Sequence, residues 1–141
     1  DSNQAFKDCT DMNADLNGWD VSSVSDTWLM FKLATKFDSD LNAWDVTSVV
    51  KHADMFAYAS NFNGDISEWH TSSSLNMANM FLSAGKFNID ISSWDVSNVE
   101  NMDNMFGTGA GGGSLDACIK FKVQASFQVC SSQTALVLGS Y

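Results

Sequence analysis

The chain has no proline, no arginine and no N-x-[ST] sequon. The missing sequon excludes asparagine-linked glycans, although the many serines leave O-linked sugars open. Acidic residues number 17 against 7 basic ones, all lysine, which gives a formal net charge of -10. Nucleic acids and anionic membrane surfaces would therefore repel the chain. No apolar run approaches the roughly 18 residues that a bilayer span needs, so we expect no membrane span.

Catalytic and metal-binding motifs are equally scarce. The glycines of residues 107–114, GTGAGGGS, match G-x-G-x-x-G but follow a helix-like pattern instead of a strand, so we interpret this run as a connector. His52 and His70 have no spacing that joins them to a cysteine as zinc ligands, and we interpret both as surface histidines. The stretch NADLNGWDVSSV begins like an EF-hand calcium loop, yet Val24 stands where the closing glutamate belongs. The sequence predicts no enzyme and no cofactor.

A 25-residue repeat is the main feature that is present. Several residue types recur at this interval without a slip, and together they form aligned columns along the chain. The clearest columns are Trp19, Trp44, Trp69 and Trp94; Asp15, Asp40, Asp65 and Asp90; Met30, Met55, Met80 and Met105; and Phe31, Phe56, Phe81 and Phe106. Repeats of this length indicate stacked units that complete one another's core. The 45% hydrophobic content of 141 residues is enough for one domain with such a core.

Each unit is interpreted as a strand, a turn, a helix and a second turn. The run from Phe87 to Val96 is rich in strand-forming residues. A hydroxyl residue such as Ser97 then stands in the N-cap place, ahead of apolar residues at steps of three and four, which is typical of a short amphipathic helix. The prediction is an α/β solenoid, leucine-rich-repeat-like, with four 25-residue strand-turn-helix units, an N-terminal half unit and a C-terminal helical cap. Its segments are 1–11 (lead and half repeat), 12–106 (four-repeat solenoid), 107–114 (Gly-rich connector) and 115–141 (cap helix and apolar tail).

The stretch FNIDISSWDVSNVENMDNMF, residues 87–106, resembles the repeat of the BspA-like surface proteins, including the mycoplasma-type lipoprotein repeats. The resemblance covers Phe6 to Phe106. It departs in the third unit, where His70, Thr71 and Ser74 replace Asp, Val and Val. The resemblance implies a leucine-rich-repeat-like fold and a non-enzymatic, exported surface protein associated with adhesion.

The aspartate column has two interpretations. Parallel turns lie about 4.8 Å apart, so this column becomes a ladder of carboxylates. Neighbouring charges at that distance repel by roughly 1 kcal/mol in water, and the ladder therefore needs partners. We favour backbone N–H groups at each bend, because Asp and Asn commonly form such turn bonds. The alternative is a row of calcium ions shared between turns and bound by Asp15, Asp40, Asp65 and Asp90.

The aromatic columns are interpreted as core, because large apolar residues between stacked turns stabilise such an assembly. A sugar-binding or hydrophobic-ligand face is the alternative. The predicted core residues are Trp19, Trp44, Trp69, Trp94, Phe31, Phe56, Phe81 and Phe106. Trp28 lies outside the tryptophan column and is the better candidate for an exposed aromatic residue.

The two ends of the stack differ in sequence. A helical stripe from Leu115 to Cys130 can cover the last unit, whereas only a polar lead precedes the half unit at Phe6. The tail TALVLGSY is apolar and strand-prone, and it either pairs back onto its own domain or adds to the edge of another molecule. An open end with such a tail favours head-to-tail association. The residues predicted to take part are Phe6, Cys9, Ala135, Leu136, Val137 and Leu138.

Three cysteines leave one thiol unpaired. In an unbroken helix Cys118 and Cys130 would lie about 18 Å apart, so a disulfide between them requires a break in that helix. Cys9 belongs to the opposite end of the stack, which disfavours an internal bond to either of them. We favour a Cys118–Cys130 disulfide with Cys9 buried, and a bond of Cys9 between molecules is the alternative.

The sequence favours a non-enzymatic, extracellular or cell-surface protein with a structural or adhesive role, which self-associates head-to-tail into a surface fibre. The alternative is a monomeric cell-surface binding domain that recognises a glycan or a protein through the faces of the solenoid. Deletion of residues 135–141 distinguishes them, because it should abolish assembly and leave ligand binding intact.

Overall fold

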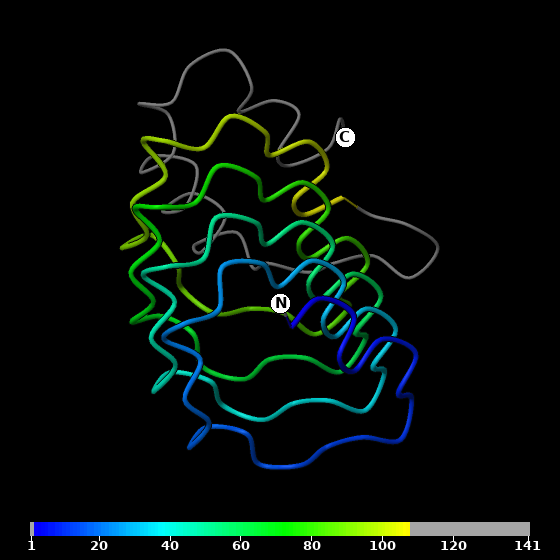
Figure 1. Cartoon of the computed structure of the whole chain (residues 1–141). Coiled ribbons are helices and arrows are strands. Elements are labelled where there is room, and N and C mark those ends of the chain that lie inside the picture. Colours follow the sequence, from blue (N-terminus) through cyan, green and yellow to red (C-terminus); the bar gives the residue numbers. More distant parts are fainter. Residues whose placement is uncertain (1, 108–141) are drawn as a thin grey trace.

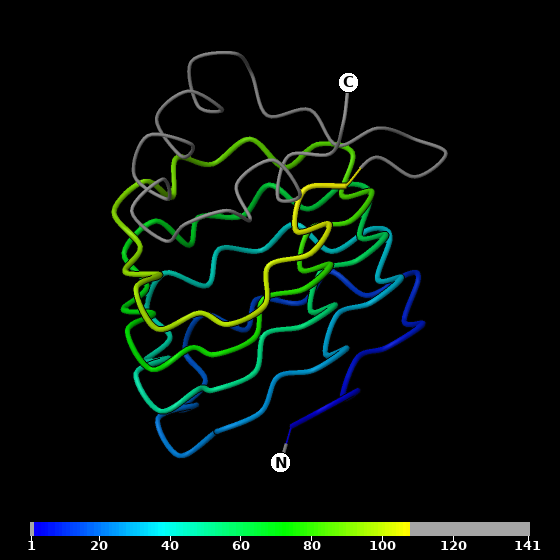
Figure 2. The ribbon, with the colours of Figure 1, turned by 90° about the horizontal axis from the view of Figure 1, so that it is seen from above.

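The computed structural model describes residues 2–107. This part of the chain winds into a stack of similar circuits, with one circuit for each 25-residue unit (Figure 1). In the perpendicular view the circuits keep the same outline from one level to the next (Figure 2). Parallel bridges join equivalent residues of successive circuits, and they pair Asp26 with Lys51, Lys51 with Asn76, and Asn76 with Asn101.

The prediction of an α/β solenoid built from strand-turn-helix units is wrong. Residues 2–107 contain no helix, and their only β-type pairings are isolated bridges. The rest of this part of the chain consists of turns and irregular segments. The comparison with leucine-rich repeats is wrong for the same reason, because both the strand and the helix of such a unit are missing from the described residues.

Successive β-turns replace the predicted helix. In residues 27–34, the N–H group of Met30 closes a turn on the carbonyl oxygen of Thr27 at 3.0 Å. The neighbouring N–H of Leu29 instead leaves the segment and donates to the carbonyl oxygen of Ala53, in the next circuit, at 3.2 Å. An α-helix sends every interior N–H to the carbonyl four residues earlier. Here the N–H groups alternate between a turn and the neighbouring circuit, so the segment is a stack of turns.

Left-handed residues explain why this segment cannot be helical. Leu29 and Leu33 have φ angles of 61° and 62°, and each stands third in a hydrogen-bonded turn. A positive φ at that position matches a type II turn and is foreign to a right-handed helix. The equivalent residues of other units also have positive φ, and they are Gln4, Asp8, Asp54, Tyr58, Asn79, Ser83 and Asn104. Apolar steps of three and four indicated a helix because consecutive turns produce the same spacing.

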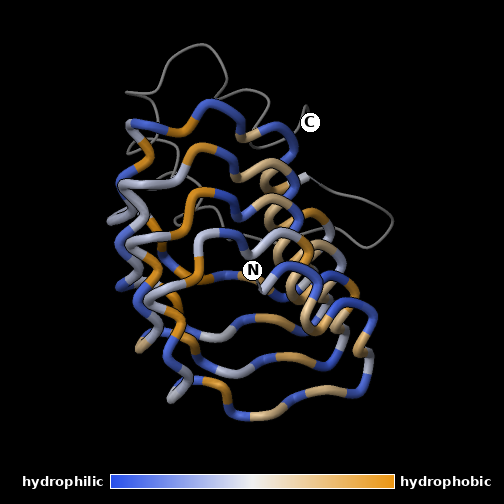
Figure 3. Tube along the Cα trace, in the orientation of Figure 1, coloured by the Kyte–Doolittle hydropathy of each residue, from blue (hydrophilic) through white to orange (hydrophobic). Residues whose placement is uncertain are grey.

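Aromatic rings stack through the centre of the circuits. The centroid of Phe56 lies 5.4 Å from that of Phe31 and 5.7 Å from that of Phe81. A second stack runs beside the first, with Phe37 and Phe62 5.8 Å apart. All five rings are fully buried or nearly so, and Figure 3 shows apolar segments recurring at the same place in successive circuits. Each unit thus buries its rings against those of its neighbours, as a repeat must.

Three tryptophans fix each circuit on the one before it. Their indole N–H groups donate to carbonyl oxygens of the preceding circuit, at 2.8 Å for Trp44 to Leu16, 2.9 Å for Trp69 to Leu41 and 3.1 Å for Trp94 to Ile66. These side chains are at most 4% exposed. Because a buried indole N–H needs an acceptor, the bond sets the register between circuits as well as filling the core.

Trp19 departs from the predicted core. Its side chain is 50% exposed, since no circuit precedes the one to which it belongs in the described part of the chain. Its ring still contacts Phe6, with the centroids 5.6 Å apart. Trp28 is 41% exposed on the side of the stack. Within the tryptophan column, therefore, Trp44, Trp69 and Trp94 belong to the core, whereas Trp19 at the end of the stack lies at the surface.

Candidate functional site

The aspartate column binds backbone N–H groups at the bends. The Oδ1 atoms of Asp15, Asp65 and Asp90 accept from the N–H two residues later, at 3.0 to 3.1 Å. Asp40 Oδ1 accepts from the N–H of Asp65 in the next circuit at 2.8 Å. Across residues 2–107, no three side chains of His, Cys, Asp or Glu come close enough to hold a metal ion. The calcium interpretation therefore has no support in this part of the chain.

A neighbouring column of aspartates binds the hydroxyls that were predicted to cap helices. Ser22, Thr47 and Ser97 donate their hydroxyl hydrogens to aspartate Oδ1 atoms two residues earlier, at 2.6, 2.6 and 2.7 Å. These bonds hold the aspartate pKa values below 3.8, and the carboxylates involved are Asp20, Asp45 and Asp95. The hydroxyls close side-chain turns and do not begin helices.

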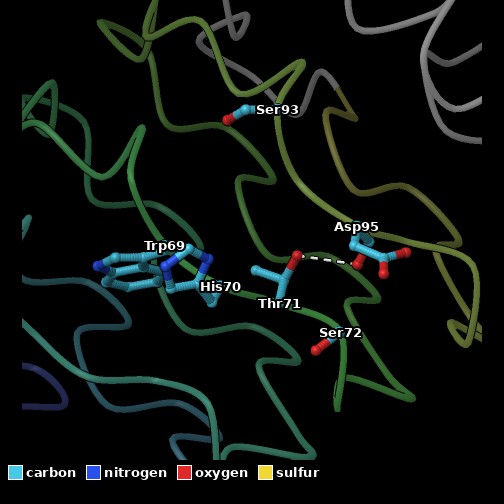
Figure 4. Close-up of a pocket in the computed structure, with 6 residues that line it drawn as sticks. All are labelled: Trp69, His70, Thr71, Ser72, Ser93 and Asp95. Carbon is cyan, nitrogen blue, oxygen red and sulfur yellow. Dashed lines mark hydrogen bonds between the residues drawn. The ribbon is translucent and has the colours of Figure 1, made fainter.

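A polar pocket of about 210 Å³ lies where the third unit departs from the repeat (Figure 4). Its lining comes from two successive circuits and consists of Trp69, His70, Thr71, Ser72, Ser93 and Asp95. The hydroxyl of Thr71 donates to the carbonyl oxygen of Asp95 at 2.9 Å, which joins the two circuits at the edge of the pocket. Trp69 is only 2% exposed, so its ring faces are not free to stack on a sugar.

Two residues of the pocket lining, His70 and Thr71, depart from the repeat. His70 stands in the column of Asp20, Asp45 and Asp95, and it is exposed. Its charge adds a small effect to the lowered pKa of Asp45, after the larger effects of the hydroxyl and backbone N–H of Thr47. Such a pocket offers hydroxyl, imidazole and carboxylate groups to a small polar molecule.

The prediction that His52 is a surface residue is wrong, because its side chain is fully buried. The signal that indicates burial is the repeat register. The equivalent residues of the two following units are Met77 and Met102, and both belong to the core. Burial lowers the pKa of His52 from 6.5 to about 3.

The N-terminal end of the stack presents a row of carbonyl oxygens. Between circuits, an N–H group donates to a carbonyl of the following circuit, as from Gln4 to Trp28 at 3.0 Å and from Phe6 to Met30 at 2.9 Å. The N–H of Asp8 donates to the carbonyl of Lys32 in the same way, at 2.8 Å. The carbonyls one repeat earlier than these three acceptors belong to Asn3, Ala5 and Lys7, and they accept no N–H from residues 2–107. Because the repeat fixes their direction, these oxygens point away from the stack.

The last described circuit presents the complementary groups. In the repeat register, the N–H groups of Asn104 and Phe106 correspond to those of Asn79 and Phe81, which donate to the next circuit at 2.9 and 2.8 Å. Within the described range, the N–H groups of Asn104 and Phe106 have no backbone acceptor. One end of the described stack thus carries backbone acceptors and the other carries backbone donors.

Of the residues predicted to take part in assembly or in the disulfide, the structure describes only Phe6 and Cys9. Cys9 is exposed, which corrects the prediction that it is buried, because the half unit to which it belongs lies at the open end. Phe6 is partly buried and packs against the core. Cys118 and Cys130 lie outside the described residues, as do Ala135, Leu136, Val137, Leu138 and the predicted cap helix.

The repeated region matches a family model, described as Mycoplasma protein of unknown function, DUF285, over residues 1–112. The chain belongs to the DUF285 family. No curated protein and no solved structure matches it. The described residues of this DUF285 protein contain no candidate for a membrane-spanning helix.

Proposed function

We propose that this DUF285 protein is a non-enzymatic structural or adhesive protein of the extracellular surface, of the BspA-like kind, which self-associates head-to-tail into a fibre. The observation that supports self-association is the row of carbonyl oxygens on the first described circuit, beside the half-exposed Trp19. A second copy is the occupant that we propose for this end, because units of a repeat protein bind one another through such rows.

In the register that joins successive circuits within the chain, the carbonyls of Asn3 and Ala5 correspond to those of Trp28 and Met30, which accept N–H groups from Gln4 and Phe6. The carbonyls of Asn3 and Ala5 should therefore accept N–H groups from a neighbouring copy. Trp19, at 50% exposure, would gain the cover that the interior tryptophans receive from a preceding circuit. Such a contact is heterologous and does not close on itself, so it produces a filament.

The test compares two exposed tryptophans. Trp19→Arg places a charge on the open end, whereas Trp28→Arg places the same charge on the side of the stack, where the side chain is also exposed (41%). We expect sedimentation velocity and negative-stain electron microscopy over a range of concentrations to show filaments for the wild type and Trp28→Arg. Trp19→Arg should remain monomeric. Monomers of the wild-type chain at every concentration would refute self-association.

Deletion of residues 135–141 tests the role predicted for the apolar tail. Loss of filaments in this variant, with Trp28→Arg still assembling, would support strand addition by the tail. Filaments that persist would assign assembly to the stacked ends alone.

A monomeric binding domain is the second candidate, and the pocket at His70 is the observation that favours it. The triple variant His70→Asp, Thr71→Val, Ser74→Val restores the residues of the other units and should remove the polar pocket while keeping the fold. We expect any saccharide retained by the wild type on a glycan array to be lost by this variant. An array that retains neither protein, or both equally, would argue against the pocket as a binding site.

A further inference from the structure

His52 is a buried polar residue that stands between Thr27 and two core methionines of its column. Its column continues with Met77 and Met102, and the residue below it is Thr27, which is 1% exposed. The imidazole Nδ1 lies 3.2 Å from the Thr27 hydroxyl oxygen. The ring stacks on that of Trp69, with the centroids 5.9 Å apart. The side chain is therefore enclosed by the circuits on both sides of its own.

The second ring nitrogen of His52 is buried without a hydrogen-bond partner in the described structure. If Nε2 carries the proton, it is a donor without an acceptor, and if it carries the lone pair, it is an acceptor without a donor. In the protonated ring both nitrogens are donors, and the Thr27 oxygen can accept from only one of them. Protonation thus adds a buried charge to a site that already leaves one polar atom unsatisfied.

No charged group within residues 2–107 compensates at this site. Asp26 of the preceding circuit is 4.0 Å from the ammonium of Lys51, and Asp54 is paired with Lys32 at 2.8 Å. From the following circuit, the group that contacts the ring is the indole of Trp69. Burial is the one cause of the lowered pKa of His52, with no contribution from a neighbouring charge.

We propose that His52 makes the stack sensitive to acid. The circuits around it stay packed together while its ring is neutral, and they separate when the ring takes up a proton. The backbone bonds that join these circuits at His52 and Thr27 run from His52 N–H to the carbonyl of Asn76 at 2.9 Å and from Thr27 N–H to the carbonyl of Lys51 at 3.0 Å. Opening these circuits gives the imidazolium access to water, which the closed stack denies it.

The direction of the pH effect follows from proton binding. The pKa of His52 is 6.5 in the unfolded chain and about 3 in the folded one, so the unfolded chain binds more protons between these values. Stability is therefore fully present above pH 6.5 and is lost as the pH falls from 6.5 toward 3. At pH 4.5 this residue alone should raise the unfolding equilibrium constant by about 100-fold relative to neutral pH.

The test is urea unfolding of the wild type and of His52→Met from pH 7.5 to pH 4.5. Methionine is the residue found at the two later positions of the column, and the Thr27 hydroxyl keeps its bond to the Lys51 carbonyl (3.1 Å) in its absence. Aspartates with a lowered pKa, such as Asp20 and Asp95, also contribute less to the stability of the fold in acid, but both proteins contain them. The difference between the two proteins should therefore isolate the effect of His52. Between pH 7.5 and pH 4.5 the unfolding equilibrium constant of the wild type should rise about 100-fold more than that of His52→Met.

His70→Gln is the matched control, since it removes the exposed histidine and should retain the acid sensitivity of the wild type. An equal loss of stability in the wild type and His52→Met would overturn the proposal.

NMR of ring-labelled histidine in the wild-type chain provides a second measurement that needs no variant. We expect the His52 ring to stay neutral at pH 5 for as long as the chain is folded, and a ring that becomes charged within the intact fold would also overturn it.

Discussion

The interior and the open end of this stack use the same residue in the same column with different results. Trp44 is 3% exposed and donates its indole N–H to the carbonyl of Leu16 at 2.8 Å. Trp19, the equivalent residue one repeat earlier, is 50% exposed. The difference is the presence of a preceding circuit, which supplies both the apolar cover and the carbonyl acceptor. A repeat residue is therefore part of the core only when its neighbouring unit is in place.

Replacement of the two tryptophans by alanine should give the largest difference in stability between the interior and the open end. Trp44→Ala should cost about 3 to 5 kcal/mol, because it opens a cavity and leaves a buried carbonyl without its donor. Trp19→Ala removes a half-exposed side chain and should cost less than half as much. Urea unfolding of monomeric samples measures both values. Equal losses would mean that the first circuit is covered in solution.

The glycines provide a second comparison between interior and end. A Cβ at Gly64 would collide with the carbonyl oxygen of Ser39 in the preceding circuit, whereas one at Gly18 would meet nothing within 4 Å. Gly64→Ala should therefore destabilise the stack by about 1 to 3 kcal/mol through a forced backbone shift. Gly18→Ala should change the stability by less than about 0.5 kcal/mol. The measurement is the urea midpoint at constant m value, and equal midpoints for the two variants would contradict close packing at residue 64.

The ion pairs should give the smallest effects. Lys32 and Asp54 are 25% and 17% exposed, and their charged atoms are 2.8 Å apart. Lys36 and Asp11, near the open end, are 63% and 83% exposed. Lys32→Gln should cost about 1 kcal/mol and Lys36→Gln should have no measurable effect, because solvent and salt screen the exposed pair. Thermal unfolding at low and high salt tests this, and a larger loss for Lys36→Gln would contradict the assignment.

The sequence was a good guide to register and a poor guide to backbone conformation. The columns of Trp and Phe correctly indicated which residues stack, as the ring spacing of Phe31, Phe56 and Phe81 shows. The same pattern wrongly predicted a helix, because apolar steps of three and four do not distinguish a helix from consecutive turns. Leu29 and Leu33 themselves give no warning of a positive φ, and the only signal is that Asp54, Asn79 and Asn104, in the column of Leu29, are residue types that adopt this conformation more readily.

The sequence indicated the site at His70 but not the burial of His52. The departure of the third unit from the repeat directed attention to His70, and the structure places a pocket beside it. His52 was misplaced because histidine is ordinarily a surface or intermediate residue, and only its column membership indicates burial. The row of carbonyl oxygens on the first circuit could be anticipated only as an open face, since the sequence does not show which backbone groups point along the stack.

What the sequence by itself determined is the 25-residue period, and with it the vertical neighbours of every side chain in residues 2–107. A period is a property of side-chain identity, so it is visible in one chain. What only the tertiary structure decided is where the backbone N–H groups find their acceptors. The acceptor of the Leu29 N–H is the carbonyl of Ala53, which belongs to another circuit, and no local pattern encodes so distant a partner. This long-range bonding selects turns over a helix, buries His52 and leaves one row of acceptors open at the N-terminal end.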